Sequence, residues 1–316
     1  MTQGTRRRAL SHALVASTVL VGFSALVPSA NAAPPSDPTP LLTYAASQKF
    51  PPEDTTRIRA FNQRQLDRIQ FELKKDPPPE TNCAQTLGAK RFSAQLDDLG
   101  GVYTNMGDDV RAAEAYSKAI ECDPRAEFLH AQLASALIDL RRYAEARAEI
   151  ERELNLGRGT FALHNLMTQI DFIDHLWTEA ALNARLAVTE APDDEQATYW
   201  QCLLWLAQQH NGVQQPSLAN RHVPQTWPGP ILASLQGKIT ENELVDAIES
   251  EDDRNRRREI LTEALFYTGE QRLAARHVPE ATRYLEATVN QRVLYFIEHH
   301  LAVAELEKLR HTDSTP

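Results

Sequence analysis

The chain has 316 residues, 42% of them hydrophobic, which suits one large domain or two ordinary ones with a buried core. Its formal net charge is −10. Residues 1–32 hold basic but no acidic residues, so the rest of the chain is more acidic still, which argues against a protein that binds nucleic acid through a basic surface.

Residues 1–32 have the pattern of a cleaved secretory signal peptide. Consecutive arginines at positions 6–8 precede an apolar run over residues 13–27, and Ala-Asn-Ala at 30–32 allows cleavage after Ala32. A membrane anchor is the alternative, but the run is shorter than the roughly 20 residues that span a bilayer. Thr5, Arg6 and Arg7 also resemble the start of a twin-arginine signal, which leaves the export route open. Because the cleavage point has no cysteine for a lipid, we expect a periplasmic or secreted protein without a stable membrane anchor.

Two segments precede the main body of the chain. Residues 33–53 are rich in proline, which disfavours helix, and predict an extended tether. Residues 54–92 predict one leading amphipathic helix and a loop, because Phe61, Leu66 and Ile69 recur at helical spacing before the prolines at 77–79.

Residues 93–210 repeat their residue types at the 34-residue period of a helical hairpin. The first copy has small residues at Gly100 and Ala112, where two helices cross, and aromatic rings at Tyr103 and Tyr116 beside the crossing. Its other matching residues are Leu96, Leu99, Ala119 and Pro124.

These residues resemble the tetratricopeptide repeat, whose pattern is W-x2-L-G-x2-Y followed by Ala, an aromatic residue, Ala and Pro. The later copies depart from it at Glu153, where Ala is usual, and at Asp171, where an aromatic residue is expected. The resemblance implies an all-α fold: a right-handed α-solenoid of tetratricopeptide helical hairpins with a C-terminal repeat and capping helix.

In the C-terminal third of the sequence, the regular succession of helical hairpins is predicted to end. A further first helix covers residues 194–210, and residues 211–255 form an irregular connection with short helices, one of them begun by a capping box of Thr240 and Glu243. Residues 256–310 predict a repeat-like hairpin and a capping helix that closes the open end of the stack, and 311–316 a disordered tail.

The segment from Trp227 to Leu309, with its Trp-Pro turn and the stretches "GKIT", "FYTG" and "FIEHHLAVAEL", resembles the NlpI-like tetratricopeptide proteins of the bacterial envelope. That resemblance implies an adaptor, often a homodimer, that brings a peptidoglycan endopeptidase to a tail-specific protease or organises cell-wall hydrolases. The chain lacks the lipid-bearing cysteine usual in that family.

The chain has three cysteines, which in an oxidising compartment allow one disulfide and an odd thiol. Cys83 falls in the loop before the first repeat and Cys122 at the end of its second helix, so these two are the better pair. Three buried thiols are the alternative.

Catalytic and metal-binding motifs are absent from the sequence: it has no G-x-S-x-G, H-E-x-x-H, P-loop or paired C-x-x-C. The adjacent pair His299 and His300 would point about 100° apart on a helix, which is poor geometry for chelating one metal ion. We therefore expect no enzyme, no cofactor and no metal site.

Residues on the first helix of each hairpin that packing does not use would line the concave side of the stack. Amides and rings there suit a peptide, although Phe128, Phe172 and Tyr199 could instead pack against neighbouring helices. The predicted partner-binding residues are Asp97, Thr104, Asn105, Phe128, Ser135, Asn165, Gln169, Phe172 and Tyr199.

The sequence thus favours a non-catalytic periplasmic protein-binding adaptor or scaffold, which the NlpI resemblance would place between peptidoglycan hydrolases and an envelope protease. The alternative is a dedicated inhibitor, immunity or chaperone protein for one secreted partner, since the same fold serves both.

Overall fold

The computed structural model describes residues 39–50, 56–155, 157–158, 160–213, 222–293 and 296–312. The predicted signal peptide lies outside this range. Within it every regular element is a helix and there is no strand, so the predicted all-α class is confirmed.

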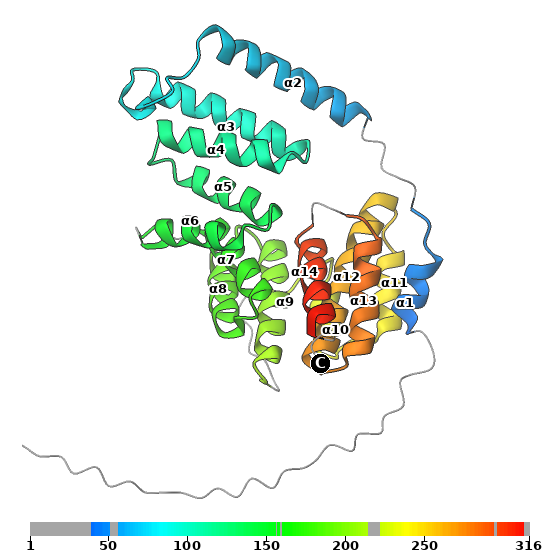
Figure 1. Cartoon of the computed structure of the whole chain (residues 1–316). Coiled ribbons are helices and arrows are strands. Elements are labelled where there is room, and N and C mark those ends of the chain that lie inside the picture. Colours follow the sequence, from blue (N-terminus) through cyan, green and yellow to red (C-terminus); the bar gives the residue numbers. More distant parts are fainter. Residues whose placement is uncertain are drawn as a thin grey trace, which may run out of the picture. The chain divides into compact units, whose positions relative to one another are not determined.

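Helices α2 to α9 follow one another, each packed against the next (Figure 1). Turns of three residues join α3 to α4, α5 to α6 and α7 to α8. Their bounds are α2 (Thr56–Lys75), α3 (Ala89–Asn105), α4 (Asp109–Cys122), α5 (Glu127–Asp139), α6 (Tyr143–Asn155), α7 (Phe161–Ile173), α8 (Trp177–Glu190) and α9 (Asp194–His210).

The turns inside four helix pairs share one backbone conformation. Gly107, Arg141 and His175, spaced 34 residues apart, have left-handed φ angles of 71°, 58° and 57°, and Arg276 has 64°. After each of them an N–H bonds to the carbonyl five residues earlier, as in a Schellman motif. These bonds run from Asp108 to Tyr103, Arg142 to Leu137, Leu176 to Asp171 and His277 to Arg272.

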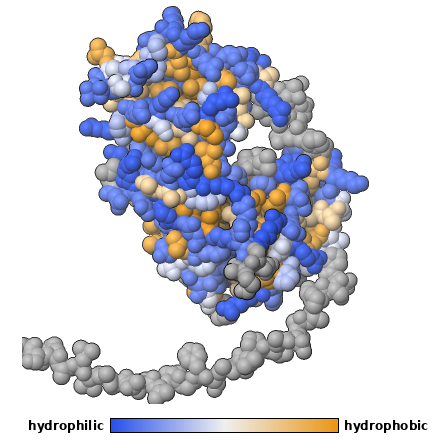
Figure 2. Space-filling model, in the orientation of Figure 1, coloured by the Kyte–Doolittle hydropathy of each residue, from blue (hydrophilic) through white to orange (hydrophobic). Residues whose placement is uncertain are grey.

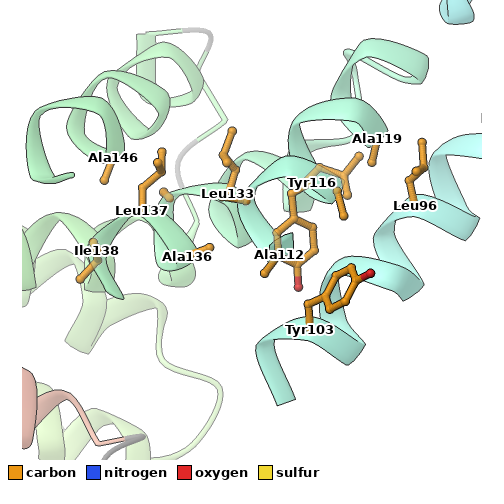
Figure 3. Packing of buried hydrophobic residues seen from close by; sticks show 14 of the residues in the cluster. Leu96, Tyr103, Ala112, Tyr116, Ala119, Leu133, Ala136, Leu137, Ile138 and Ala146 are labelled. Atoms are coloured by element: carbon orange, nitrogen blue, oxygen red, sulfur yellow. The ribbon is translucent and has the colours of Figure 1, made fainter. Parts of the chain in front are cut away.

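Gly100 brings α3 and α4 close together. A Cβ at this position would lie 2.5 Å from Cε1 of Tyr116, whose side chain is buried. Figure 3 shows Tyr103 and Tyr116 projecting into the space between the two helices, with Ala112 and Ala119 on α4. The predicted roles of Gly100, Tyr103 and Tyr116 at this crossing are confirmed.

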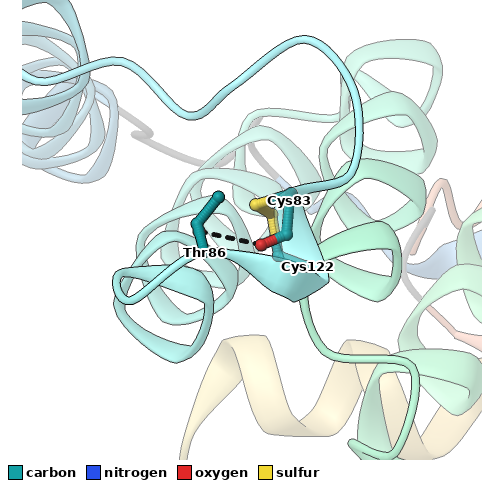
Figure 4. The surroundings of a disulfide bond; sticks show 3 residues. All are labelled: Cys83, Thr86 and Cys122. Carbon is teal, nitrogen blue, oxygen red and sulfur yellow. Dashed lines mark hydrogen bonds between the residues drawn. A yellow bond between two sulfur atoms is a disulfide. The ribbon is translucent and has the colours of Figure 1, made fainter.

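A disulfide fastens the start of the array. Cys83, in a short 3-10 helix (Cys83–Gln85), is bonded to Cys122 at the end of α4, with a Cα–Cα distance of 4.6 Å (Figure 4). The hydroxyl of Thr86 donates to the carbonyl of Cys83 at 2.8 Å. Cys202, which is buried in α9, is free.

The predicted tether is wrong for part of its length. Residues 40–47 form a helix, α1 (Pro40–Ser47), whose Leu41 is fully buried. This helix packs against three C-terminal helices, namely α11 (Glu241–Glu249), α12 (Arg254–Ala274) and α13 (Val278–Asn290). A proline at the first helical position is compatible with a helix, because its missing N–H would have no partner there.

The C-terminal helices begin with α10 (Gly229–Leu235), which packs on α9, and end with α14 (Ile297–Thr312). The predicted capping box of Thr240 and Glu243 is confirmed at the start of α11. The last helix, predicted as a cap, packs on α12 and α13 and also reaches back to α7. It runs to Thr312, two residues into the predicted tail.

Candidate functional site

The nine predicted partner-binding residues, which we call the predicted face, all lie on α3, α5, α7 and α9. They differ in how much of each side chain reaches solvent. Those on α3 and α5 remain largely accessible, whereas most of those on α7 and α9 are covered.

On α3, Thr104 and Asn105 are exposed. The Thr104 hydroxyl donates to the carbonyl of Gly100 at 3.1 Å, and the Asn105 carbonyl accepts a hydrogen bond from the Asn62 amide of α2 at 3.2 Å. The end of α3 is therefore held by local bonds while the Asn105 amide faces solvent.

On α5, the Phe128 ring is 57% exposed and Ser135 is half-buried. Between them Gln132 donates a hydrogen bond to Asp97 of α3. Partial burial raises the pKa of Asp97 and the charge of Asp98 raises it further, while the Gln132 bond opposes both effects. Asp97 thus joins the two helices midway along the face.

Two carboxylates that we did not select in the sequence extend this face, Asp109 at the start of α4 and Asp139 at the end of α5. His300 of α14 approaches Asp139, with Nδ1 at 3.4 Å from Oδ1. Partial burial raises the pKa of both carboxyl groups, and the nearby His300 opposes this. Asp139 follows Ser135 by four residues, so helical periodicity alone could have placed it on the face.

On α7, Phe172 and Gln169 are buried, and only Asn165 keeps partial exposure. The Phe172 ring packs edge-on against Trp177, with 5.3 Å between ring centroids. Phe172 and Gln169 therefore offer no surface to a partner in this conformation, and for Phe172 the alternative reading, packing against neighbours, is the correct one.

Tyr199 of α9 is also not free for a partner. It is half-buried, and its hydroxyl donates to Glu263 of α12 at 3.3 Å. Burial and the Glu263 charge raise the pKa of the Tyr199 hydroxyl far above its usual range. The C-terminal helices therefore occupy this end of the predicted face.

A pair of buried carboxyl groups lies where α9, α12 and α14 meet. Glu263 and Glu298 are 2% and 4% exposed. Glu263 accepts hydrogen bonds from Tyr199 and the Trp227 indole, and Glu298 accepts one from the Tyr267 hydroxyl at 3.1 Å. Burial raises the pKa of Glu298 to about 7, and burial together with the Glu298 charge raises that of Glu263.

The Trp177 indole is stacked between two imidazoles, those of His175 and His210. The Trp177 ring centroid is 4.0 Å from that of His210 and 4.8 Å from that of His175. His210 Nε2 is 3.1 Å from Glu270 of α12, and His175 Nε2 is 2.6 Å from Glu305 of α14. These bonds connect the α7–α8 turn and α9 to the C-terminal helices, and no short-range sequence pattern predicts them.

A surface hollow of about 590 Å³ lies beside the disulfide, lined by Leu87, Lys90, Pro124 and Arg125 among others. Across the described ranges, no group of three or more His, Cys, Asp or Glu side chains is placed to hold a metal ion. The view in Figure 2 shows mainly hydrophilic side chains with apolar residues in small patches between them.

The helices in the part of the chain that the structure describes include none with both the length and the apolar character needed to cross a membrane.

Comparison with known proteins gives no family for this chain: no protein-family model matches it, and no curated protein matches it.

Proposed function

We propose that the chain is a non-catalytic protein-binding module whose contact surface is the part of the predicted face on α3 and α5. The observation that carries this proposal is the difference in exposure along the face. Thr104, Asn105 and the ring of Phe128 are accessible, whereas Phe172 and Gln169 are buried. An exposed aromatic ring beside amide and carboxylate groups suits a peptide.

In this proposal the paired helices are tetratricopeptide repeats stacked in a right-handed solenoid. The left-handed turn residues at positions 107, 141 and 175 support it, because their 34-residue spacing matches the period of that repeat. The first helices of the repeats would then line the concave side, which is where such arrays bind their partners.

The partner segment would carry one apolar and one basic residue. Phe128 lies at the start of α5 and Asp139 at its end, beside Asp109, and a helix rise of 1.5 Å per residue separates these positions by about 16 Å. An extended peptide covers that distance in about five residues. A ring contact at Phe128 and a lysine or arginine near the two carboxylates therefore fit one short extended segment.

The cellular setting belongs to the same proposal. The pattern of residues 1–32 supports export to the periplasm or beyond, and the NlpI-like stretches between Trp227 and Leu309 support an adaptor that links peptidoglycan hydrolases to an envelope protease, acting as a monomer or a homodimer.

Affinity capture from a bacterial envelope extract, analysed by mass spectrometry, tests the proposal with three baits: the wild-type chain, Phe128→Ala and the matched control Phe71→Ala. Phe71 is another exposed aromatic residue, 70% exposed on α2, and is not part of the predicted face. We expect a cell-wall hydrolase or processing protease with wild type and Phe71→Ala, and its loss with Phe128→Ala.

Equal capture by all three baits would contradict the proposed contact surface. Capture of one unrelated secreted protein in place of envelope enzymes would contradict the adaptor and favour a dedicated inhibitor, immunity or chaperone protein.

A further inference from the structure

We propose that α14 is a proton-controlled latch, which covers the end of α7 while the Glu263–Glu298 pair is protonated and releases it when the pair ionises. The inference concerns when the α7 part of the predicted face is open, and in that respect it rests on the proposed function. The latch itself requires no partner and can be measured on the chain alone.

The covering contact is formed by one side of α14. Leu301 and Ala304 are buried against Phe172 and Ile173 at the end of α7 and against Phe266 of α12. Without α14 these two α7 residues would lose the apolar side chains that cover them. They would then extend the accessible surface of α3 and α5 along the array.

Polar contacts fix α14 at the edges of this apolar patch. The Lys308 ammonium donates to the carbonyl of Ile173, Glu307 forms an ion pair with Arg141 at 2.5 Å, and Glu305 bonds to His175. Arg141 and His175 are the left-handed residues of the α5–α6 and α7–α8 turns. The helix is therefore attached to two successive turns of the array.

The attachment of α14 is least stable at the buried carboxyl pair, Glu263 and Glu298. Glu298 of α14 and Glu263 of α12 are both buried, and two neighbouring ionised carboxylates repel each other in a medium of low polarity. Their hydrogen-bond donors, Tyr267 for Glu298 and Tyr199 with Trp227 for Glu263, are neutral. Arg256 of α12 acts on Glu263 from a partly exposed position.

The remaining groups near Glu298 do not change the direction of the effect. Burial raises the pKa of Tyr267 and of the Cys202 thiol well above their usual ranges, so both stay neutral where the carboxyl groups titrate. The imidazoles of His175 and His210 hydrogen-bond to Glu305 and Glu270 and do not contact the Glu263–Glu298 pair. Among the described residues, no hydrogen bond or ion pair joins α13 to Glu298.

The sign of the pH dependence follows from the burial of Glu298. Docking raises its pKa from the ordinary 4.5 to about 7, so the docked helix takes up a proton that the released helix loses. Between these two values the ratio of docked to released α14 falls about tenfold per pH unit, or about 300-fold in all. The latch holds in acid and opens as the pH rises towards the Glu298 pKa.

Hydrogen exchange on the intact chain at pH 5.5 and pH 8.5, corrected for intrinsic exchange rates, tests the latch. We expect protection in peptides covering 297–312 and 161–173 to fall about 30-fold, since about 1.5 pH units of the range lie between pH 5.5 and the Glu298 pKa. Glu298→Gln, an uncharged side chain of the same shape, is expected to keep its protection at pH 8.5. Glu286→Gln on α13, the same substitution at an exposed carboxylate, is expected to lose protection as wild type does.

Equal protection of wild type at the two pH values would overturn the latch, as would a Glu298→Gln variant that opens in parallel with wild type. If Glu298→Gln does not fold, Glu298→Met, which is uncharged and of similar length, takes its place with the same expectation. Because no partner is present, failure of the latch is distinguishable from failure of the capture experiment.

Discussion

Replacing Gly100 and Gly101 by alanine, one at a time, tests the close crossing of α3 and α4. A Cβ at Gly100 would lie 2.5, 2.7 and 2.8 Å from three ring atoms of Tyr116. That ring is buried and cannot move aside freely, so the overpacking cost lies near the upper end of about 1–3 kcal/mol. Alanine gains about 1 kcal/mol over glycine in a helix, which leaves a net loss of about 2 kcal/mol.

The neighbouring glycine is the matched control. At Gly101 the nearest atom to an added Cβ is the Tyr116 hydroxyl oxygen at 3.9 Å, an ordinary contact. Gly101→Ala is therefore expected to stabilise the chain by about 0.5–1 kcal/mol through helix propensity alone.

Urea unfolding followed by far-ultraviolet circular dichroism, with the disulfide intact, measures both variants. A Gly100→Ala chain as stable as Gly101→Ala would refute the reasoning, because the two substitutions share the propensity gain and differ only in the clash with Tyr116.

Two further predictions concern cross-links within the array. Replacing Cys83 and Cys122 together by serine removes a bond across a sequence separation of 39, and is expected to cost about 3–4 kcal/mol in urea unfolding; an unchanged midpoint would contradict this. Arg147→Met removes the ion-pair partner, at 2.8 Å, of the fully buried Asp171, and is expected to cost about 3 kcal/mol at pH 8. Burial already raises the pKa of Asp171 and losing Arg147 raises it further, so thermal melts should show a smaller loss at pH 5; a loss that grows in acid would contradict the sign.

The sequence period predicted the helices of the array well, because small and aromatic residues at fixed spacing determine where helices cross. The predicted helix over 194–210 has the bounds of α9, and the capping box at Thr240 is present. The same reasoning missed α1, since it counted the prolines of the segment and gave no weight to Leu41, Leu42 and Tyr44, which bury that helix.

The partners of the two residues that depart from the repeat pattern became clear only in the structure. Glu153 is 1% exposed and bonds to Arg158 at 3.1 Å, and Asp171 pairs with Arg147. Each polar side chain at an apolar position thus has a charged partner. The period gives the position of such a residue but not its partner.

The predicted face shows the same limit for longer distances. Helical spacing predicts which side of each first helix is not used for packing. Thr104, Asn105 and Phe128 lie on that side and are exposed. The cover over Phe172 comes from α14, through contacts such as His175 to Glu305 that join positions 130 residues apart. No local pattern contains that information.

The contact of α1 with the C-terminal helices has a consequence for how the chain unfolds. In an array where each repeat contacts only its neighbours, segments can melt separately from either end. Here the Thr39 hydroxyl lies 2.5 Å from that of Tyr284, across 245 positions, and α14 returns to α7. Contacts of such high contact order slow folding, since long loops must close first, and they tie the melting of the array to that of its C-terminal helices.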